Sequence, residues 1–302
     1  MTTAPFDALP VEPSLLGESP FWHPDESALY WCDITGRRIH RWRADAAVHD
    51  RWQYPCEPGC IAPLVGGGLL AAMRDGLWRV DTTTGARALV CAPPYDPACE
   101  RFNDGKADPT GRFWVGTMFE PRTPHAALYR FADGRCERIA GDITTSNGLA
   151  WSPDGGTLYW SDTRAHVVRA FDVDLATGGL SNGRDFARFA PPGAGDAATT
   201  YGGRPDGAAV DCEGAYWVAM FEGQRLLRLG RDGRVLEVHA LPVRCPTMPC
   251  FGGSDLRTLY VTTARANRSA DELASQLLAG RVLSRRVDVP GLPVNFVRLA
   301  GR

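Results

Sequence analysis

The sequence predicts an all-β fold, a six-bladed β-propeller that forms a single domain over residues 1–302. A two-part sequence motif, called the phrase below, recurs six times, and helical periodicity is absent. A chain of this length also suits one large ring of β-strands. The first part is a short apolar strand, a tight turn of Pro-x-Gly type and an alternating aromatic strand. It occurs at residues 20–33, 62–73, 106–118, 148–162, 207–221 and 249–264.

The second part follows each copy and is typical of an exposed strand with Arg and then a turn. It occurs at residues 38–45, 76–85, 127–134, 167–178, 226–233 and 282–291. About four short strands per repeat cannot bury their faces alone, whereas six units stacked in a ring can. A β-sandwich with a second domain is the alternative, but it would not require six copies of one phrase.

Three further segments have predicted places in the ring. Residues 7–16 and 293–300 are both available as strands that close it, and residues 190–205 form a surface loop, expected over the site. Asp33 and Asp162 end second strands near the same face as the site, and they are expected to cap turns, with a place in the site as the alternative.

The composition of the chain limits which binding partners and which cellular compartment we expect. A net charge of −2 gives no indication of nucleic acid or of an anionic membrane surface, and no apolar run is long enough to span a bilayer. The first residues lack the basic and apolar segments of a secretory signal. None of the nine cysteines forms a C-x-x-C pair, which favours free thiols in a reducing cytoplasm. We therefore expect a cytoplasmic protein, monomeric or weakly homo-oligomeric.

The register of the repeats predicts a site on the axis. Six positions before the turn, four repeats carry an oxygen-bearing side chain, namely Glu18, Asn103, Asn147 and Asp206. The first strand of each blade lines the channel of a propeller, so these side chains should meet at one mouth of it. Carboxylates packed together repel and are costly to bury, and a divalent cation relieves both costs. Oxygen ligands favour Ca²⁺, Mg²⁺ or Mn²⁺.

Ordinary turn formation is the alternative for these residues, since Asn and Asp before Gly commonly form turns. The shared register, and Glu18, which is a poor turn former, favour a metal-binding channel instead. Arg101 precedes the cluster, and its planar fork suits adjacent hydroxyl groups, although a surface ion pair is the alternative. Lys106 lies beyond the mouth by strand alternation and is given no role.

Several long segments resemble the SMP-30/gluconolactonase/regucalcin family. They cover nearly the whole chain and read "LGESPFW" (16–22), "RFNDGKADPTGRFWVGTM" (101–118), "SNGLAWSPDG" (146–155), "PDGAAVDCEGAYWVA" (205–219), "CFGGSDLRTLYVTTAR" (250–265) and "LAGRVLS" (278–284). The resemblance implies a six-bladed propeller with one catalytic divalent metal in the channel. It also implies hydrolysis of sugar aldonolactones.

Residue roles follow from the same resemblance. It implies that Glu18, Asn147 and Asp206 are metal ligands, with Asp206 as the general base. Asn103, Arg101 and Glu120 match residues that bind the substrate, Asn103 from a place beside the metal. The metal can be Ca²⁺, Mg²⁺, Mn²⁺, Zn²⁺ or Fe²⁺.

The chemistry expected of such a site is ester hydrolysis without a covalent nucleophile. A cation polarises the lactone carbonyl and activates water, while Asp206 moves the proton. The G-x-S-x-G motif of a serine hydrolase is absent from the sequence. Two alternatives stay open: an aryl-ester or organophosphate hydrolase that uses the same metal, and a non-enzymatic Ca²⁺-binding propeller.

Overall fold

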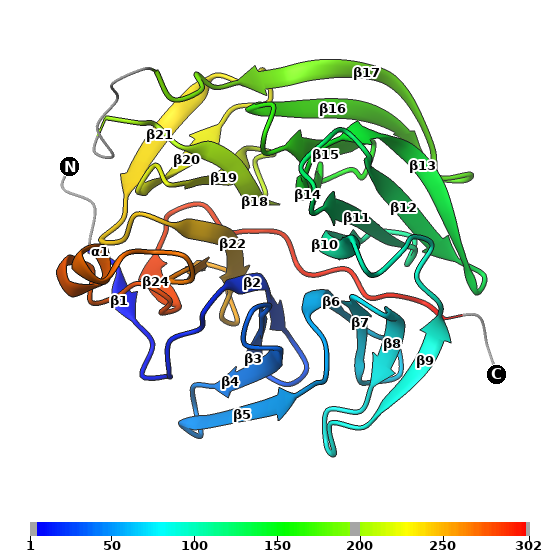
Figure 1. Ribbon diagram of the computed structural model, residues 1–302, viewed down its shortest axis with the longest axis horizontal. Helices are drawn as coiled ribbons and strands as arrows, with labels where there is room; N and C mark the ends of the chain where they lie inside the picture. Colours follow the sequence, from blue (N-terminus) through cyan, green and yellow to red (C-terminus); the bar gives the residue numbers. More distant parts are fainter. Residues whose placement is uncertain (1–4, 194–199, 300–302) are drawn as a thin grey trace.

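A computed structural model of the chain describes residues 5–193 and 200–299. Six four-stranded antiparallel sheets stand as blades around a central axis, which confirms the predicted six-bladed propeller (Figure 1). Within the described ranges, no helix has the length and apolar character needed to cross a membrane.

The blades share one order of strands from the axis outward (Figure 1). The innermost strands are β2 (Gly17–His23), β6 (Pro58–Pro63), β10 (Glu100–Ala107), β14 (Ser146–Trp151), β18 (Arg204–Val210) and β22 (Pro246–Gly252). The second strands are β3 (Ala28–Asp33), β7 (Leu69–Met73), β11 (Phe113–Phe119), β15 (Thr157–Asp162), β19 (Tyr216–Phe221) and β23 (Thr258–Thr263). The third strands are β4 (Arg38–Arg43), β8 (Gly76–Val80), β12 (Ala126–Ala132), β16 (Val167–Asp174), β20 (Arg225–Leu229) and β24 (Leu283–Arg286). The outermost strands are β5 (Val48–Gln53), β9 (Arg87–Cys91), β13 (Arg135–Ile143), β17 (Gly179–Arg188), β21 (Val235–Ala240) and β1 (Asp7–Ala8).

The third strands are less exposed than the sequence suggested. Most of their residues are buried or half-buried, and the exposed positions concentrate in the outermost strands. The expectation of an exposed Arg-bearing strand was wrong because each third strand is covered along one edge by the outermost strand and on its faces by the neighbouring blades. The short helix α1 (Ala270–Ser275) was not expected either.

The ring is closed by the N-terminal strand. β1 pairs with β24 and becomes the outer strand of the last blade, so part of the predicted segment 7–16 has the expected role. The segment 293–300 does not join a blade as far as residue 299. Residues 290–298, the C-terminal strap, instead cross the end of the channel (Figure 1) and bind the backbone of other blades, as where Val297 N–H donates to Pro63 O at 2.8 Å.

The hydrophobic core lies between neighbouring blades. Buried residues form six clusters, and each cluster joins side chains from two adjacent blades or from the first and last ones. The aromatic residues of the repeated phrase supply much of it, since Trp31, Trp114 and Trp217 on the second strands are fully buried. No blade therefore has a core of its own, as expected for a repeat architecture.

A buried Asp–Trp contact recurs at the turn between the first two strands. In "DCEGAYW" the Asp211 carboxylate accepts the indole N–H of Trp217 at 2.9 Å and the Arg228 Nε–H at 2.8 Å, and it also accepts two backbone N–H groups of the turn. Asp108 and Trp114 form the equivalent pair in "DPTGRFW" at 3.0 Å. The repeated turn is thus held by a carboxylate as well as by its Gly.

Asp211→Ala is expected to destabilise the protein by about 3–5 kcal/mol, because it leaves the Trp217 indole N–H and two backbone N–H groups of the turn without their acceptor, at about 1–3 kcal/mol each. Arg228 keeps Glu213 and Glu237 as ion-pair partners. Urea unfolding followed by circular dichroism checks this. The exposed substitution Asp232→Ala is the control and should change stability by less than about 0.5 kcal/mol. A loss below about 1 kcal/mol for Asp211→Ala would contradict the interpretation.

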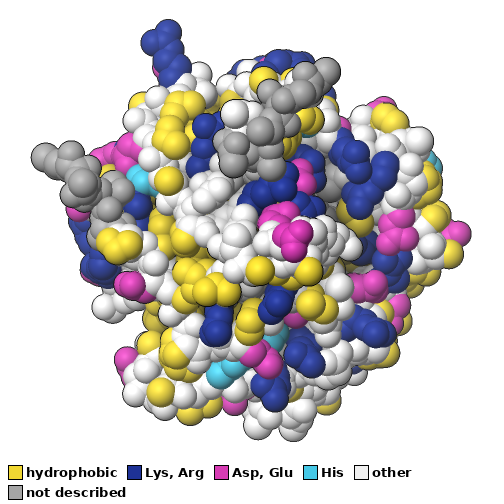
Figure 2. Space-filling model, turned by 60° about the vertical axis from the view of Figure 1, so that its left-hand side comes forward, with side chains coloured by type: hydrophobic (Ala, Val, Ile, Leu, Met, Phe, Trp, Pro, Cys, Tyr) yellow, Lys and Arg dark blue, Asp and Glu magenta, His cyan; other side chains and the backbone are white. Residues whose placement is uncertain are grey.

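Asp33 and Asp162 cap turns as expected. Asp33 accepts the backbone N–H groups of Leu15, Leu16 and Gly36, and Asp162 accepts those of Thr144, Thr145 and Arg164. All nine cysteines are free thiols. On the face shown in Figure 2, basic and acidic side chains are interspersed with small hydrophobic patches.

Candidate functional site

The predicted site residues lie at a bulge in the innermost strands. The register between first and second strands shifts at the same level of every blade, for example between Glu18 and Phe21 and between Asn147 and Ala150. A bulge re-aims a side chain and leaves backbone groups out of the ladder. The shifts in β10 and β18 enclose Asn103 and Asp206. The four side chains are therefore turned toward the axis by one repeated irregularity.

Contacts between blades confirm that these positions converge. Asn103 Nδ2 donates to Asn147 Oδ1 at 2.8 Å and to the Ser146 carbonyl at 2.8 Å, which joins β10 to β14. Gly148, with φ +62°, lets β14 approach β18 so closely that a Cβ there would lie 3.0 Å from the Asp206 carbonyl oxygen. The Tyr216 hydroxyl donates to the Gly148 carbonyl at 2.8 Å and fixes this approach.

Glu18 and Asp206 are two buried carboxylates that share one environment. Burial raises the pKa of Glu18 well above its usual value, and the charges of Asp206 and Asp104 raise it further. Burial also raises the pKa of Asp206 to about 8, with Arg204 opposing the rise and Asp104 adding to it. Neither carboxylate forms an ion pair with a described Lys, Arg or His, so the ionised pair has no counter-charge in direct contact, and both pKa values are raised for that reason as well as by burial.

Arg101 lies beside this cluster and is buried, not in a surface ion pair. Its Nη1 donates to Asn103 Oδ1 at 2.7 Å and to the Phe102 carbonyl at 2.9 Å. Burial lowers the pKa of Arg101 to about 10. The side chain is thus held against Asn103, and the predicted substrate-binding pair is one hydrogen-bonded unit.

Glu120 stands further out. Its side chain is 40% exposed, and its Oε1 accepts a hydrogen bond from Arg74 Nη2 at 2.5 Å. Arg74 also binds Glu57 through its Nε at 2.9 Å. The structure therefore places Glu120 at the rim in a chain of charges with Arg74 and Glu57, two residues that the sequence did not single out.

Asp104 is a third carboxylate at the axis, and the sequence analysis missed it. It is 3% exposed, and its Oδ2 accepts the backbone N–H of Leu149, which the bulge of β14 has released, at 2.8 Å. Its Oδ1 has no hydrogen-bond partner among the described residues. Burial raises the pKa of this carboxyl, and the charge of Lys106 opposes the rise. The one sequence feature that could have pointed to Asp104 is its position directly after Asn103 in "NDG".

The donor set suits a hard divalent cation. Two buried carboxylates without an ion-pair partner and the amide oxygen of Asn147 are oxygen ligands, which Ca²⁺, Mg²⁺ and Mn²⁺ prefer. Asn147 is oriented for this because its Nδ2 donates to Thr163 Oγ1 at 2.8 Å, so its oxygen is on the side of Asn103. Within the described ranges, no group of three or more His, Cys, Asp or Glu is placed to hold a metal.

Three arginines, Arg122, Arg164 and Arg204, stand near one another beside the cluster and are called the rim arginines. Arg122 Nη1 lies 2.8 Å from Met118 Sδ and 3.5 Å from Thr145 Oγ1, and Met118 also contacts Arg101. Partial burial lowers the pKa of Arg122, the charge of Arg164 lowers it further, the charge of Glu120 opposes the fall, and that of Arg204 adds to it. Of these rim arginines only Arg204 has an ion-pair partner among the described residues, Glu222 at 2.8 Å. Arg122 and Arg164 are therefore two rim cations without an ion-pair partner among the described residues, a feature that single arginines in the sequence did not indicate.

Only part of the predicted loop 190–205 belongs to the residues that the structure describes. Residues 194–199 lie outside them. Tyr201, which follows them, is buried, and its hydroxyl forms a hydrogen bond with His166 Nε2 at 2.6 Å. This contact ties the end of the segment to the blade that carries Asn147.

Residues 16–265 match the model of the SMP-30/Gluconolactonase/LRE-like region. The 6-deoxy-6-sulfogluconolactonase of Pseudomonas putida is 44% identical over 93% of this chain and 94% of its own length. The regucalcin of Danio rerio is 36% identical over 93% of each chain.

A solved structure has the same arrangement. The structure described as a calcium-binding protein, regucalcin, from Agrobacterium tumefaciens has a TM-score of 0.90 and is 28% identical. The match covers 99% of this chain and 100% of that chain.

Proposed function

The chain belongs to the SMP-30/gluconolactonase/LRE-like family, and on that premise we propose that it is a lactonase that opens sugar aldonolactones to aldonic acids with one divalent cation. The observation that carries the proposal is the pair of buried carboxylates, Glu18 and Asp206, which meet on the axis without an ion-pair partner. A scaffold gains nothing from such a pair, since removing charge from water is costly.

Each residue of the site has a task in ester hydrolysis. A divalent cation held by Glu18, Asn147 and Asp206 would polarise the lactone carbonyl and lower the pKa of the attacking water. Asp206 accepts the proton of that water and returns one to the ring oxygen as the C–O bond breaks. Arg101 and Asn103 orient the ring hydroxyls, because the guanidinium fork offers paired donors and is already fixed by hydrogen bonds.

The rim arginines indicate a substrate with an anionic substituent away from the lactone carbonyl. Arg122 has no carboxylate partner among the described side chains and stands next to Arg164, so an incoming anion relieves repulsion between two cations. The relative from Pseudomonas putida is named for a lactone with a sulfonate at carbon 6. We propose that this chain also takes a gluconolactone that bears a sulfonate or phosphate at that end.

A substrate panel tests both levels of the proposal. Acid release is measured for glucono-1,5-lactone, 6-phosphogluconolactone and 6-deoxy-6-sulfogluconolactone, against paraoxon and phenyl acetate, with and without EDTA and after subtraction of spontaneous opening. The anionic lactones should be opened fastest, and EDTA should stop the reaction. If no lactone is opened faster than in buffer, the lactonase proposal fails; faster turnover of paraoxon or phenyl acetate would favour the esterase alternative.

Arg122→Gln is expected to lower kcat/KM for the anionic lactone by about 10–100-fold, since a hydrogen bond to a charged group contributes about 1.5–3 kcal/mol. For glucono-1,5-lactone the change in kcat/KM should stay within about threefold, because that substrate has no anionic group for Arg122 to bind. Arg135→Gln, an exposed arginine on the outer strand β13, is the matched control. An equal loss for both lactones would contradict the assignment of Arg122 to the anion.

A further inference from the structure

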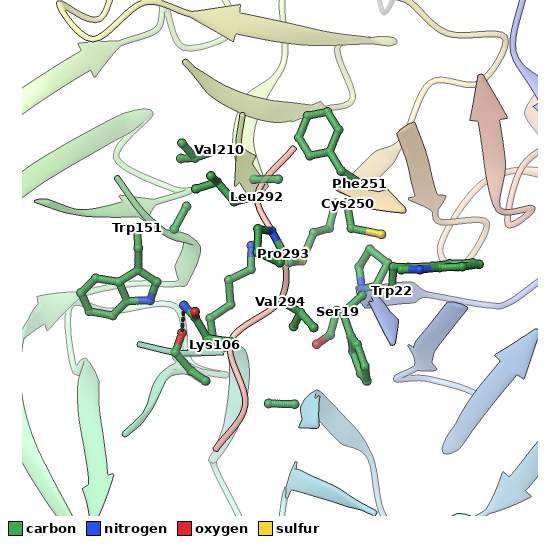
Figure 3. A pocket seen from close by; sticks show the side chains of 18 of the residues that line it. Ser19, Trp22, Lys106, Trp151, Val210, Cys250, Phe251, Leu292, Pro293 and Val294 are labelled. Carbon is green, nitrogen blue, oxygen red and sulfur yellow. Dashed lines mark hydrogen bonds between the residues drawn. The ribbon is translucent and has the colours of Figure 1, made fainter. Parts of the chain in front are cut away.

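A cavity lies on the axis beyond the carboxylate cluster. Its volume is about 220 Å³, and it is lined by residues that follow the site residues along the same innermost strands, such as Trp22, Lys106 and Trp151. Because these strands run in the same direction, their later residues lie toward the opposite end of the channel. The C-terminal strap contributes Leu292, Pro293, Val294 and Asn295 and crosses the cavity (Figure 3). None of the predicted site residues, Asp206 included, is among the residues that line this cavity.

The walls of this cavity are largely apolar. Trp22, Phe251 and Val294 line it from three different segments of the chain (Figure 3). Met248 adds further aliphatic surface. No Asp or Glu is among its lining residues. An apolar lining with a few directed polar groups is the usual character of a small-molecule site.

Lys106 is the one charged residue of the lining. Its side chain extends toward the middle of the cavity (Figure 3), its Nζ donates to the Ala208 carbonyl, and it forms no ion pair with a described carboxylate. Burial lowers the pKa of Lys106, while the charges of Asp104, Cys250 and Glu18 act in the opposite direction. Asp104 lies two residues earlier on the same strand, β10, and offsets part of this charge. An ammonium group has three N–H donors, and the Ala208 carbonyl uses one of them.

Trp151 supplies a second donor. The residue is only 6% exposed, its Nε1 has no hydrogen-bond partner among the described residues, and Figure 3 shows the nitrogen edge of its indole turned toward the middle of the cavity. Other indoles of the ring behave differently: those of Trp31, Trp78, Trp114, Trp160 and Trp217 each donate to a Ser hydroxyl or an Asp carboxylate. A buried N–H without an acceptor costs about 1–3 kcal/mol, so this one marks a place for an acceptor.

We propose that this cavity binds a small organic acid. Its carboxylate accepts hydrogen bonds from Lys106 Nζ and Trp151 Nε1, and its apolar body packs against Trp22, Phe251 and Val294. A carboxylate fits better than a neutral acceptor because Lys106 brings a positive charge that no lining carboxylate neutralises. The volume limits the ligand to a small molecule, such as a single-ring aromatic acid or a short branched acid.

The strap is built to admit such a ligand. Its two ends are held by backbone hydrogen bonds, as from Gly291 to Leu256 and from Val297 to Pro63. Between Leu292 and Val297 no backbone N–H of the strap is bonded to described backbone, and the Asn295 side chain makes one bond, to the Ala107 carbonyl at 3.2 Å. Leu292, Val294 and Phe296 hold this middle stretch by side-chain packing, so it can lift at the cost of those contacts without breaking a strand of the ring.

Calorimetric titration with benzoate tests the proposal, with benzamide as the neutral counterpart. The titration is run on the full chain in EDTA, so that the acid has no cation to bind at the other mouth, and it is repeated with Asp206→Ala. Saturable one-site binding of benzoate is expected in both. Lys106→Met should weaken benzoate at least about tenfold and leave benzamide within about twofold, since only the charged ligand loses its ion pair. Trp151→Phe should weaken both probes.

Two results would overturn the proposal. One is the absence of saturable benzoate binding at millimolar concentrations, and the other is equal benzoate affinity in wild type and Lys106→Met. Trp151→Phe keeps every charge and guards against a folding defect in the lysine variant, and circular dichroism checks the fold of each. Because the readout is binding and not hydrolysis, the result is independent of whether the protein proves to be a lactonase.

Discussion

Asp206→Asn is expected to abolish lactone hydrolysis and at the same time to raise the Tm of the metal-free protein near pH 8. The rate of hydrolysis should fall by about 10²–10⁴-fold, because the variant loses the group that accepts the proton of water. Stability should rise because the substitution removes a buried carboxylate that repels Glu18 and whose pKa is raised to about 8. Active-site groups commonly lower the stability of the fold in this way.

The two readouts separate a catalytic role from a structural one. A residue that merely supports the fold would lower both activity and Tm when replaced, whereas Asp206 should move them in opposite ways. Asp25→Asn, at an exposed turn carboxylate, is the matched control and should change neither. Retention of more than about a tenth of the activity in Asp206→Asn, or a fall in its Tm, contradicts the assignment.

The ring and the convergence at its axis could be predicted because both follow from repetition. Once six copies of the phrase are aligned, Asn103 and Asn147 occupy one position, and the symmetry of a propeller brings equivalent positions together. The hydrogen bond between these two side chains confirms that convergence. Their roles toward a cation and a substrate stay predictions.

The parts that escaped prediction depend on departures from repetition. Asp104 reaches the axis because a bulge turns two successive residues of β10 inward, and strict alternation would have placed it on the other face. Arg122 and Arg164 come from different blades and occupy unequal positions, so no register connects them. The strap was expected to be a strand, yet its Pro-containing middle crosses the channel and lines a cavity instead.

Adding a divalent cation is expected to stabilise the protein more as pH rises. In the metal-free protein the buried carboxyls of Glu18 and Asp206 bind protons more tightly than they do in the unfolded chain. Stability from this source is therefore complete below about pH 4 and is lost as pH rises toward the folded pKa of Asp206, about 8. A cation replaces the protons as the counter-charge, so it restores the stability that deprotonation removes.

Thermal unfolding of EDTA-treated and Ca²⁺- or Mn²⁺-loaded protein measures this. The gain in Tm should be small near pH 5 and reach at least about 5 °C near pH 8.5, given saturating metal. Asn147→Leu is the informative variant, because it removes a neutral ligand and leaves both carboxyls, so it should shrink the gain without altering the pH trend of the metal-free protein. A gain that is equal at both pH values, or one that survives Asn147→Leu unchanged, would place the cation away from these three side chains, and the lactonase proposal would lose the observation that carries it.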